Sequence, residues 1–341
     1  MNIRKIAELA GVSVATVSRV FNHPERVMPE TRERVLAVTR EHNFTPNWFA
    51  RGLTLGSTKT ITLLVPDIAA DVNRNIISGI DTVAGNKGFV VILGQTRDDA
   101  RAEFDFLQLM KNRKVDGAIQ IRSQMDAAMA AEAEAFDIPR VHIGKNRECG
   151  CDMICYFDYE EAAYRLFRHL ASLGHQSSVL LHDRGEDDLA LEIEAGLNRA
   201  AKDLRKSLFF STMTGPSGTE GGFSALQRLA EKGELPHVLI TMNDLQAIGA
   251  LRAARDRKIR IPDDLALVSF NDSPVCSVVS PAITSIEMPA AKLGMASARL
   301  LFDRIEGEDG ESDVMQEMVL QPKLKIRESC GNKTRVFELF D

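Results

Sequence analysis

The chain has 341 residues, of which 44% are hydrophobic and 26% are charged. This length suggests two or three domains, and the composition excludes a disordered chain and an apolar run that could span a membrane. The opening residues mix charged and apolar side chains within each turn, so they do not resemble a secretory signal. The five cysteines are unevenly spaced and do not suggest a disulfide framework. We therefore expect a cytoplasmic protein with no membrane partner.

Positive charge is concentrated at the amino end of the chain. The formal net charge is −6, yet residues 1–59 contain nine Lys or Arg and only five Asp or Glu. Affinity for nucleic acid depends on Lys and Arg side chains that neutralise phosphates. The amino end is therefore the part of the chain that we expect to face DNA.

Residues 2–45 contain three stretches with helical apolar periodicity and no strand-like run, which predicts three short helices. Asn2 and Ser13 can cap the first two helices, and Gly11 permits a tight turn between them. Pro29 suits the first position of the third helix. The spacing of the first two helices is that of a helix-turn-helix.

From Ile61 onward, short apolar runs rich in β-branched residues alternate with amphipathic helical stretches, and a second series of this kind begins after about residue 158. Such βαβ repetition predicts two doubly wound parallel sheets. Because ligands bind beyond the carboxyl ends of such strands, we expect a cleft lined by the loops after Val65, Leu93, Thr241 and Phe270. The predicted strands are Ile61–Val65, Phe89–Leu93, Ala118–Ile121, Arg140–Ile143, Ser178–Leu181, Leu208–Ser211, Val238–Thr241 and Leu265–Phe270.

The second helix of a helix-turn-helix enters the major groove, and its first residues meet base edges. Val14 and Ala15 can make only apolar contacts, which suit a thymine methyl group, and Thr16 is the third residue of this turn that we expect to meet base edges. Arg19, one turn later, can pair with guanine. The alternative interpretation is that residues 11–13 form an ordinary turn between two helices, with no role in DNA binding. The side chains placed for phosphate contacts are Ser13, Ser18, Asn22 and Arg26.

Several motifs in one order carry a resemblance to a known family. The run from Ile3 to Leu53, beginning IRKIAELAGVSVATVSRVFN, resembles the headpiece of the LacI/GalR family of bacterial transcription regulators. The likeness continues to about residue 330. The matching stretches are LLVPDI at 63–68, KVDGAI at 114–119, LASLGH at 170–175, NDLQAIGAL at 243–251, IPDDLALVSF at 261–270 and SPAITSI at 280–286.

The resemblance implies an all-α helix-turn-helix headpiece followed by a hinge and a two-lobed α/β core similar to periplasmic binding proteins. The core dimerises in this family and binds an effector in its cleft. The implied divisions are 1–45 for the headpiece, 46–59 for the hinge, 60–330 for the core and 331–341 for the tail. The first lobe is expected at 60–158 plus 287–317, and the second at 159–284 plus 318–330.

The resemblance further implies a homodimeric repressor of a palindromic DNA operator, without enzymatic activity or a cofactor. The effector is expected to be a sugar, sugar acid, sugar phosphate or nucleoside-like molecule. The hinge is expected to become helical on DNA, where Leu53 would wedge into the minor groove. Each expected effector contact could instead have a structural role, such as a helix cap or a turn. These expected contacts are Asp71, Asn73, Gln95, Asn243 and Asp272.

The chain departs from the family pattern at several ligand positions. Ile193 stands where an arginine commonly anchors the ligand, Ser217 lies near the position of a stacking aromatic, and Asn271 replaces an acid. Stacking and a charged anchor are major sources of affinity for sugar-like ligands. Three cations could substitute as anchors and would favour an anionic ligand: Arg122, Lys145 and Arg184.

Two rival functions remain open at this point. Cys149, Cys151 and Cys155 form a cluster, with His142 nearby in sequence, that could serve a redox- or metal-responsive regulator. Structural zinc usually takes four ligands, however, and no second cysteine pair is present, so we expect no metal site. The second rival is a sugar-fold enzyme with an accessory DNA-binding domain. The absence of phosphate-loop, metalloprotease and nucleophile-elbow motifs counts against it.

Overall fold

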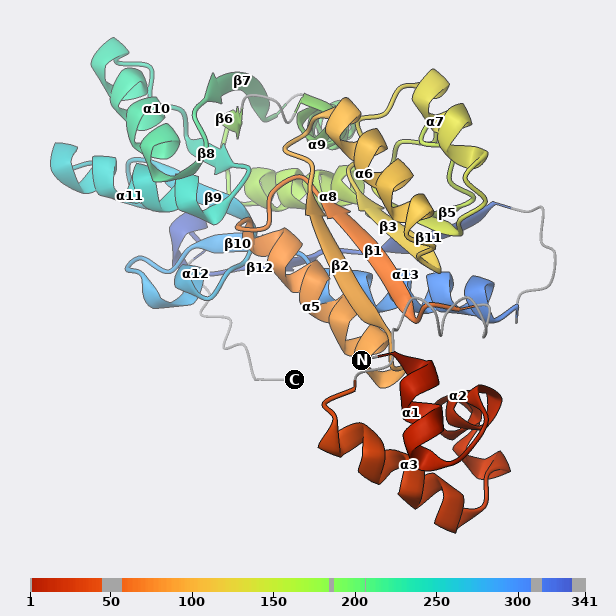
Figure 1. Cartoon of the computed structure of the whole chain (residues 1–341). Helices are drawn as coiled ribbons and strands as arrows, with labels where there is room; N and C mark the ends of the chain where they lie inside the picture. Colours follow the sequence, from red (N-terminus) through yellow and green to blue (C-terminus); the bar gives the residue numbers. More distant parts are fainter. Residues whose placement is uncertain (1, 45–56, 184–186, 206, 308–314, 333–341) are drawn as a thin grey trace.

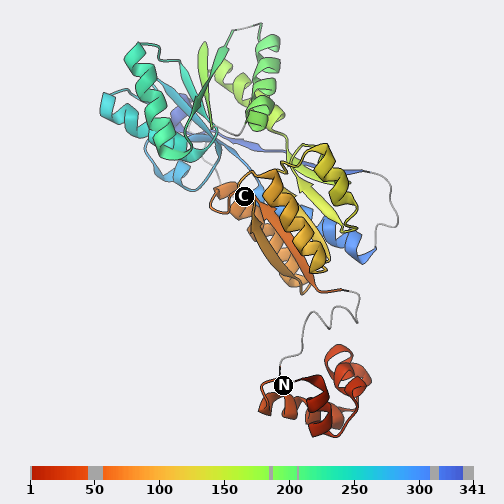
Figure 2. The same ribbon diagram turned by 45° about the horizontal axis from the view of Figure 1, so that its top comes forward.

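The amino end folds as three helices that stand apart from the rest of the chain. The computed structural model describes residues 2–44, 57–183, 187–205, 207–307 and 315–332. Figures 1 and 2 show the headpiece helices as a unit separate from the two sheets. The headpiece consists of α1 (Ile3–Ala10), α2 (Val14–Asn22), a 3-10 turn (Pro24–Arg26) and α3 (Pro29–Glu41).

Local hydrogen bonds set the ends of these helices as the sequence predicts. The Asn2 side chain accepts from the Lys5 amide at 3.0 Å, and Ser13 Oγ accepts from the Thr16 amide at 3.1 Å. Gly11 adopts the left-handed φ of +64° that its turn requires. The predicted helix-turn-helix is confirmed. Its small core consists of Ile6, Ala7, Ala10, Val17, Val20 and Val35.

The first lobe of the core contains a six-stranded sheet in the order β11-β5-β4-β3-β1-β2, and all its neighbouring strands are parallel. Helices α5 (Asp71–Asn86), α6 (Ala100–Asn112) and α7 (Ala127–Glu134) connect its strands. The strands are β1 (Thr60–Val65), β2 (Val90–Gln95), β3 (Gly117–Ile121), β4 (Arg140–Ile143), β5 (Met153–Phe157) and β11 (Gln316–Leu320).

The second lobe repeats this winding with the order β12-β10-β9-β8-β6-β7, and only the β10–β12 pair is antiparallel. The two predicted doubly wound sheets are therefore confirmed. The strands are β6 (Ser177–Asp183), β7 (Phe209–Gly215), β8 (Val238–Thr241), β9 (Ala266–Asn271), β10 (Thr284–Glu287) and β12 (Lys323–Lys325). The helical elements are α8 (Tyr159–Ser172), α9 (Asp187–Asp203), α10 (Gly218–Lys232), α11 (Asp244–Arg257), α12 (Val275–Val278) and a 3-10 turn (Glu328–Cys330).

The chain returns to the first lobe through α13 (Ala290–Glu306), which packs closely on α5. A Cβ atom at Gly294 would lie 2.1 Å from the Ile76 carbonyl oxygen, and one at Gly79 would lie 2.1 Å from the Ala291 oxygen. Any side chain at these two positions would push the helices apart. This close packing lies directly beside the cavity described below.

The expected lobe boundaries need correction by a few residues. Glu287 was expected in the first lobe, but it pairs with Asn271 in the second sheet. The boundary after residue 317 falls inside β11, which pairs with β5 as far as Leu320. Strand pairing, which sets both limits, is a long-range contact that the local apolar pattern does not report.

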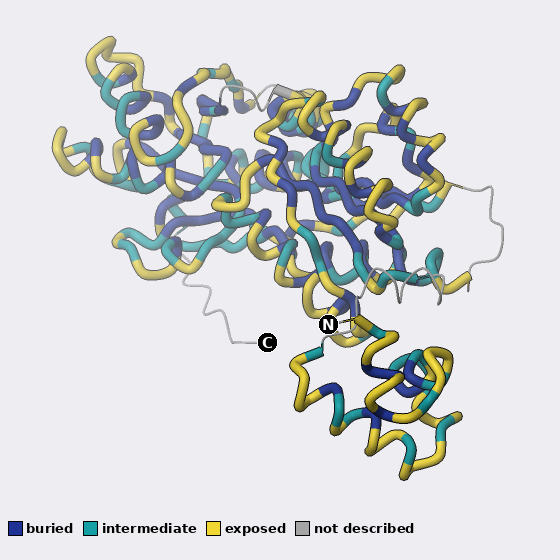
Figure 3. The backbone as a smooth tube through the Cα atoms, in the orientation of Figure 1, coloured by how far each residue is buried: buried dark blue, intermediate teal, exposed yellow. Residues whose placement is uncertain are grey.

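The strand predictions were most accurate for the buried central strands. The edge strands β2 and β7 start one residue later than predicted and run to Gln95 and Gly215, because their polar ends still pair with a neighbour. Strands β5, β10, β11 and β12 were not individually predicted. Figure 3 shows that the buried backbone follows the strands of both sheets, with exposed residues on the outer helices.

Within the described parts of the chain, no helix is both long enough and apolar enough to cross a membrane.

Candidate DNA-binding face and ligand cavity

Helix α2 presents its first turn and one arginine to solvent. Val14 is 42% exposed, and Ala15 and Arg19 are also exposed. Val17 and Val20, on the opposite side of the helix, are buried in the headpiece core. The apolar residues thus fix the helix from behind, and the three exposed side chains can meet another molecule. They are three of the four residues that the sequence assigned to base contacts, and Thr16 is the fourth.

Thr16 and some of the polar residues around it make hydrogen bonds to one another within the headpiece. Thr16 is half-buried, and its hydroxyl lies 2.9 Å from Ser13 Oγ. Asn22 Nδ2 donates to Ser18 Oγ at 3.1 Å, so these two expected phosphate contacts bind each other. Arg26 is exposed beside the second helix. Leu53 and the expected hinge helix lie outside the described residues.

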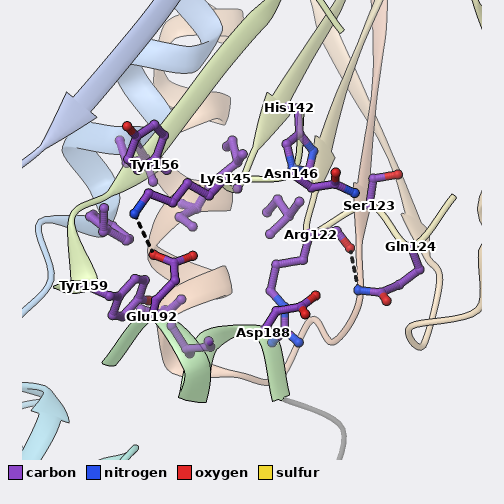
Figure 4. A pocket seen from close by; sticks show the side chains of 18 of the residues that line it. Arg122, Ser123, Gln124, His142, Lys145, Asn146, Tyr156, Tyr159, Asp188 and Glu192 are labelled. Atoms are coloured by element: carbon purple, nitrogen blue, oxygen red, sulfur yellow. Dashed lines mark hydrogen bonds and ion pairs between the residues drawn. The ribbon is translucent and has the colours of Figure 1, made fainter. Parts of the chain in front are cut away.

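A cavity of about 510 Å³ lies between the lobes, beyond the carboxyl ends of β3, β4 and β5. Its first-lobe wall comes from the loops at 122–124 and 144–146 and from α5 and α13, which contribute Ile76 and Leu293. Its second-lobe wall comes from α8 and α9. Figure 4 shows these walls, with Tyr159, Asp188 and Glu192 opposite the loops that carry Ser123 and Asn146.

Charged groups of opposite sign face each other across this cavity. Lys145 Nζ of the first lobe lies 3.4 Å from Glu192 Oε2 of α9, and it also lies over the Tyr156 ring at 5.5 Å. Burial raises the pKa of Glu192, and the charge of Lys145 opposes that shift. In Figure 4, Arg122 extends toward Asp188 along the same cavity. Both cations of the cavity thus come from the first lobe, and the acids that they face come from the second lobe.

His142, on β4, is a fully buried side chain in the wall of this cavity. Neither ring nitrogen makes a hydrogen bond of good geometry among the described residues, although the Gln120 backbone lies near enough to oppose part of the fall in the pKa of the ring. Burial, assisted by the charge of Arg140, lowers the pKa of His142 to about 4. The imidazole is therefore neutral near pH 7, with one nitrogen as donor and the other as acceptor.

The structure places three of the five expected effector residues beside cavities. Asn73 lines the 510 Å³ cavity, although its amide also donates to the Asp67 carbonyl at 2.8 Å. Asp71 and Asp272 line a second cavity of about 410 Å³. There Asp71 pairs with Arg74 at 2.5 Å, and Asp272 accepts two hydrogen bonds from Arg327 at 2.5 and 3.1 Å. The expected set is therefore divided between two sites.

The other two expected residues, Gln95 and Asn243, line neither cavity. Gln95 is exposed at the end of the edge strand β2. Asn243 caps α11 by accepting from the Gln246 amide at 2.9 Å, and it donates to Asp183 at 3.2 Å. The alternative explanation as a helix cap thus describes the observed contacts of Asn243. Ser217 binds the same carboxylate at 2.8 Å, so this part of the second lobe is joined by internal hydrogen bonds.

The sequence did not identify most of the residues that line the larger cavity. The expected loops followed β1, β2, β8 and β9, but the loops that contribute to its wall follow β3 and β4. Arg122 and Lys145, which the sequence suggested as substitute anchors, both line it, and Arg184 lies outside the described residues. A usable signal was present, because polar residues follow directly after both of these predicted strands. The newly found side chains include Ser123, Gln124, His142, Asn146, Tyr156, Tyr159, Asp188 and Glu192.

The three clustered cysteines do not converge on one point. All three are buried free thiols, and Cys155 packs in the main apolar core with Val141 and Ile143. Cys151 instead donates to Gln120 Oε1 at 3.6 Å, and its interaction with Cys149, together with burial, raises its pKa. Across the described residues, no group of three His, Cys, Asp or Glu side chains is arranged to hold a metal ion. The geometry thus gives no support to a metal-responsive regulator.

Comparison with known proteins agrees with this architecture. Residues 2–47 match the lacI family of bacterial regulatory proteins, and residues 167–330 match a periplasmic binding protein-like domain. The HTH-type transcriptional regulator DegA of Bacillus subtilis (strain 168) is 30% identical over 337 residues, which cover 96% of this chain and 98% of that protein.

Two solved structures are similar over nearly the whole chain. The Lac repressor dimer bound to operator and the anti-inducer ONPF is 25% identical, with a TM-score of 0.85 and coverage of 97% of this chain and 99% of that one. The complex of the transcriptional regulator CelR with cellobiose is 25% identical, with a TM-score of 0.68 and coverage of 96% and 99%. The exposed helix-turn-helix, the two-lobed core and these relatives together establish that the chain belongs to the lacI family of bacterial regulatory proteins and is a DNA-binding transcription regulator.

Proposed function

We propose that the protein is a cytoplasmic homodimeric repressor whose two headpieces bind the half-sites of a palindromic operator. The observation that carries this proposal is the first turn of α2, where Val14, Ala15 and Arg19 are exposed on a helix fixed from behind by its apolar face. The similarity to an operator-bound Lac repressor dimer supports the same arrangement. In the proposed complex with DNA, Val14 and Ala15 contact thymine methyl groups and Arg19 pairs with guanine.

A small-molecule effector in the 510 Å³ cavity controls the affinity for the operator. The cavity wall comes from both lobes, so an occupant contacts both and favours one relative position of the lobes over another. A similar two-lobed regulator binds cellobiose. The protein carries out no catalysis in this scheme and needs no cofactor, since the ligand acts only by shifting the population between two states.

The experiment begins with selection of operator duplexes from a randomised DNA library by the full-length protein. Binding of the selected duplex is then measured by fluorescence anisotropy for wild type and for Leu53→Ala. A minor-groove wedge at Leu53 predicts at least a tenfold loss of affinity, because the bend that admits further contacts is lost. Leu9→Ala, at an exposed leucine of α1, is the matched control and should bind as wild type does.

Unchanged affinity of Leu53→Ala would refute the hinge wedge. Failure of the wild-type protein to enrich any duplex would refute the repressor assignment itself. Enrichment of duplexes without twofold symmetry would contradict the homodimer.

A further inference from the structure

The side chains beside His142 make hydrogen bonds with other groups, whereas the His142 imidazole makes no well-formed hydrogen bond within the described residues. On the same face of the sheet, Arg140 donates to the Cys149 and Gly150 carbonyls, and Gln120 donates to Glu103 at 2.7 Å. His142 is 0% exposed, and among the described residues neither of its ring nitrogens is bonded. A buried polar side chain is usually paired, so an unpaired one in a cavity wall points to a partner that arrives with the occupant.

The chain also makes room for this imidazole. Gly144 follows β4 with a φ of +151°, and a Cβ atom there would lie 2.6 Å from His142 Nε2. Only glycine allows the backbone to pass so close to the ring at this φ. Figure 4 shows the imidazole beside Asn146, with Ser123 farther along the same wall and with Asp188 and Glu192 on the opposite side of the cavity. The ring thus forms part of the cavity wall, next to the loop that carries Lys145 and Asn146.

We propose that His142 determines the specificity of the cavity by binding a hydroxyl group of an uncharged effector. This inference rests on the proposed function, in which the cavity is the effector site. A neutral imidazole offers one donor and one acceptor, and a hydroxyl group can both accept from the first and donate to the second. Glu192 Oε2 lies on the opposite wall, 3.4 Å from Lys145 Nζ, and a carboxylate oxygen can accept a second hydroxyl beside that ion pair.

The charges around the cavity argue against an anionic effector. Lys145 already pairs with Glu192, and Arg122 has an interaction partner as well. The acids Glu148 and Asp188 line the cavity in addition. An anion would have to displace a carboxylate from its cation and would then meet the remaining acids, whereas an uncharged molecule leaves these pairs intact. The anionic ligand considered from the sequence is therefore disfavoured.

The first arm of the test compares matched uncharged and anionic compounds on the wild-type protein by thermal shift. The pairs are ribose and ribose 5-phosphate, glucose and glucuronate, and adenosine and adenosine monophosphate. We expect an uncharged member to raise Tm and its anionic counterpart to have no effect. A Tm increase with anionic members only, or with no member of the panel, overturns the proposal.

The second arm tests the hydroxyl contact with the uncharged compound that binds and its deoxy analogues, using calorimetry. On wild type, one deoxy analogue should bind about tenfold more weakly than its parent, because it leaves the imidazole unpaired. On His142→Phe the parent and this analogue should bind equally. On His142→Asn, which keeps a donor and an acceptor, part of the discrimination should return. This readout does not depend on overall stability.

The control is His237→Phe, which replaces a histidine directly before β8, at the end of that strand away from the cavity. It should discriminate between parent and analogue as wild type does. Retained discrimination in His142→Phe, or its loss in the control as well, overturns the role of His142. Operator binding by the same wild-type preparation is measured separately, so failure of the repressor function is distinguished from failure of this ligand assignment.

Discussion

The DNA-binding face and the ligand cavity are built in opposite ways. The first is a single turn of α2 together with Arg19, and the contacts that set it lie within a few residues, such as the Ser13 cap on Thr16. The second combines loops after β3 and β4 with four helices, and its ion pair joins Lys145 to Glu192 from the other lobe. A function that resides in one helix depends on local sequence, whereas the cavity depends on how distant segments pack.

If the cavity depends on packing between distant segments, a substitution at the α5–α13 contact beside it should have the largest effect on stability. Gly294→Val places carbon atoms against the Ile76 carbonyl at the α5–α13 contact and should cost at least about 4 kcal/mol in the free energy of unfolding. Urea unfolding of the full-length protein measures this. Gly85→Ala, on α5 with no atom within 4 Å of its Cβ position, is the matched control and should be neutral or slightly stabilising. A Gly294→Val protein as stable as wild type would contradict the close packing.

The next effect concerns the buried histidine and pH. The folded pKa of His142 is about 4, below the ordinary value of 6.5, so its contribution to stability is complete above pH 6.5. As pH falls toward 4, the unfolded chain binds a proton that the folded protein does not, and about 3 kcal/mol is lost. His142→Phe and His142→Asn should lack this loss in urea unfolding between pH 7 and pH 4.5. Glu192 and Asp183 have pKa values raised by burial, so they increase the free energy of unfolding as pH falls. Their effect is the same in wild type and both variants, and it cancels in the comparison.

Parallel pH curves for wild type and both variants would show that His142 is not the buried neutral group described above. They would also remove the physical basis for its role toward an uncharged effector.

The smallest effect is expected at the DNA-binding face, where a single exposed side chain changes no packing. Arg19→Ala should weaken operator binding by about 1–3 kcal/mol and relax the preference at one base pair of each half-site. Competition anisotropy with singly substituted duplexes measures both. Arg34→Ala, at an exposed arginine of α3, is the charge-matched control and should leave the base preference unchanged. An Arg19→Ala protein that keeps its full preference at every position would move base recognition to other residues.

These two regions also differ in how well the sequence predicted them. The caps at Asn2 and Ser13, the turn at Gly11 and the buried central strands follow from local rules, and the structure confirms them. The effector residues were carried over by position from a family likeness. Asn73 lies in the larger cavity, Asp272 is held by Arg327, and Asn243 is held by its own helix and Asp183. A residue can thus occupy the position of a ligand contact in the fold while its side chain is bound by another residue of the same chain.

The sequence by itself determined the helix-turn-helix, the two wound sheets and the family, because helix caps, apolar periodicity and ordered motifs act over short stretches of chain. Only the tertiary structure decided which polar groups share the cavity. His142 and Glu192 are 50 residues apart in number and lie in different lobes, and sheet order and lobe packing bring them to one cavity. The absence of a well-formed hydrogen bond to the His142 ring is likewise a property of its surroundings, because hydrogen bonding and burial are settled by neighbours that are distant in the chain.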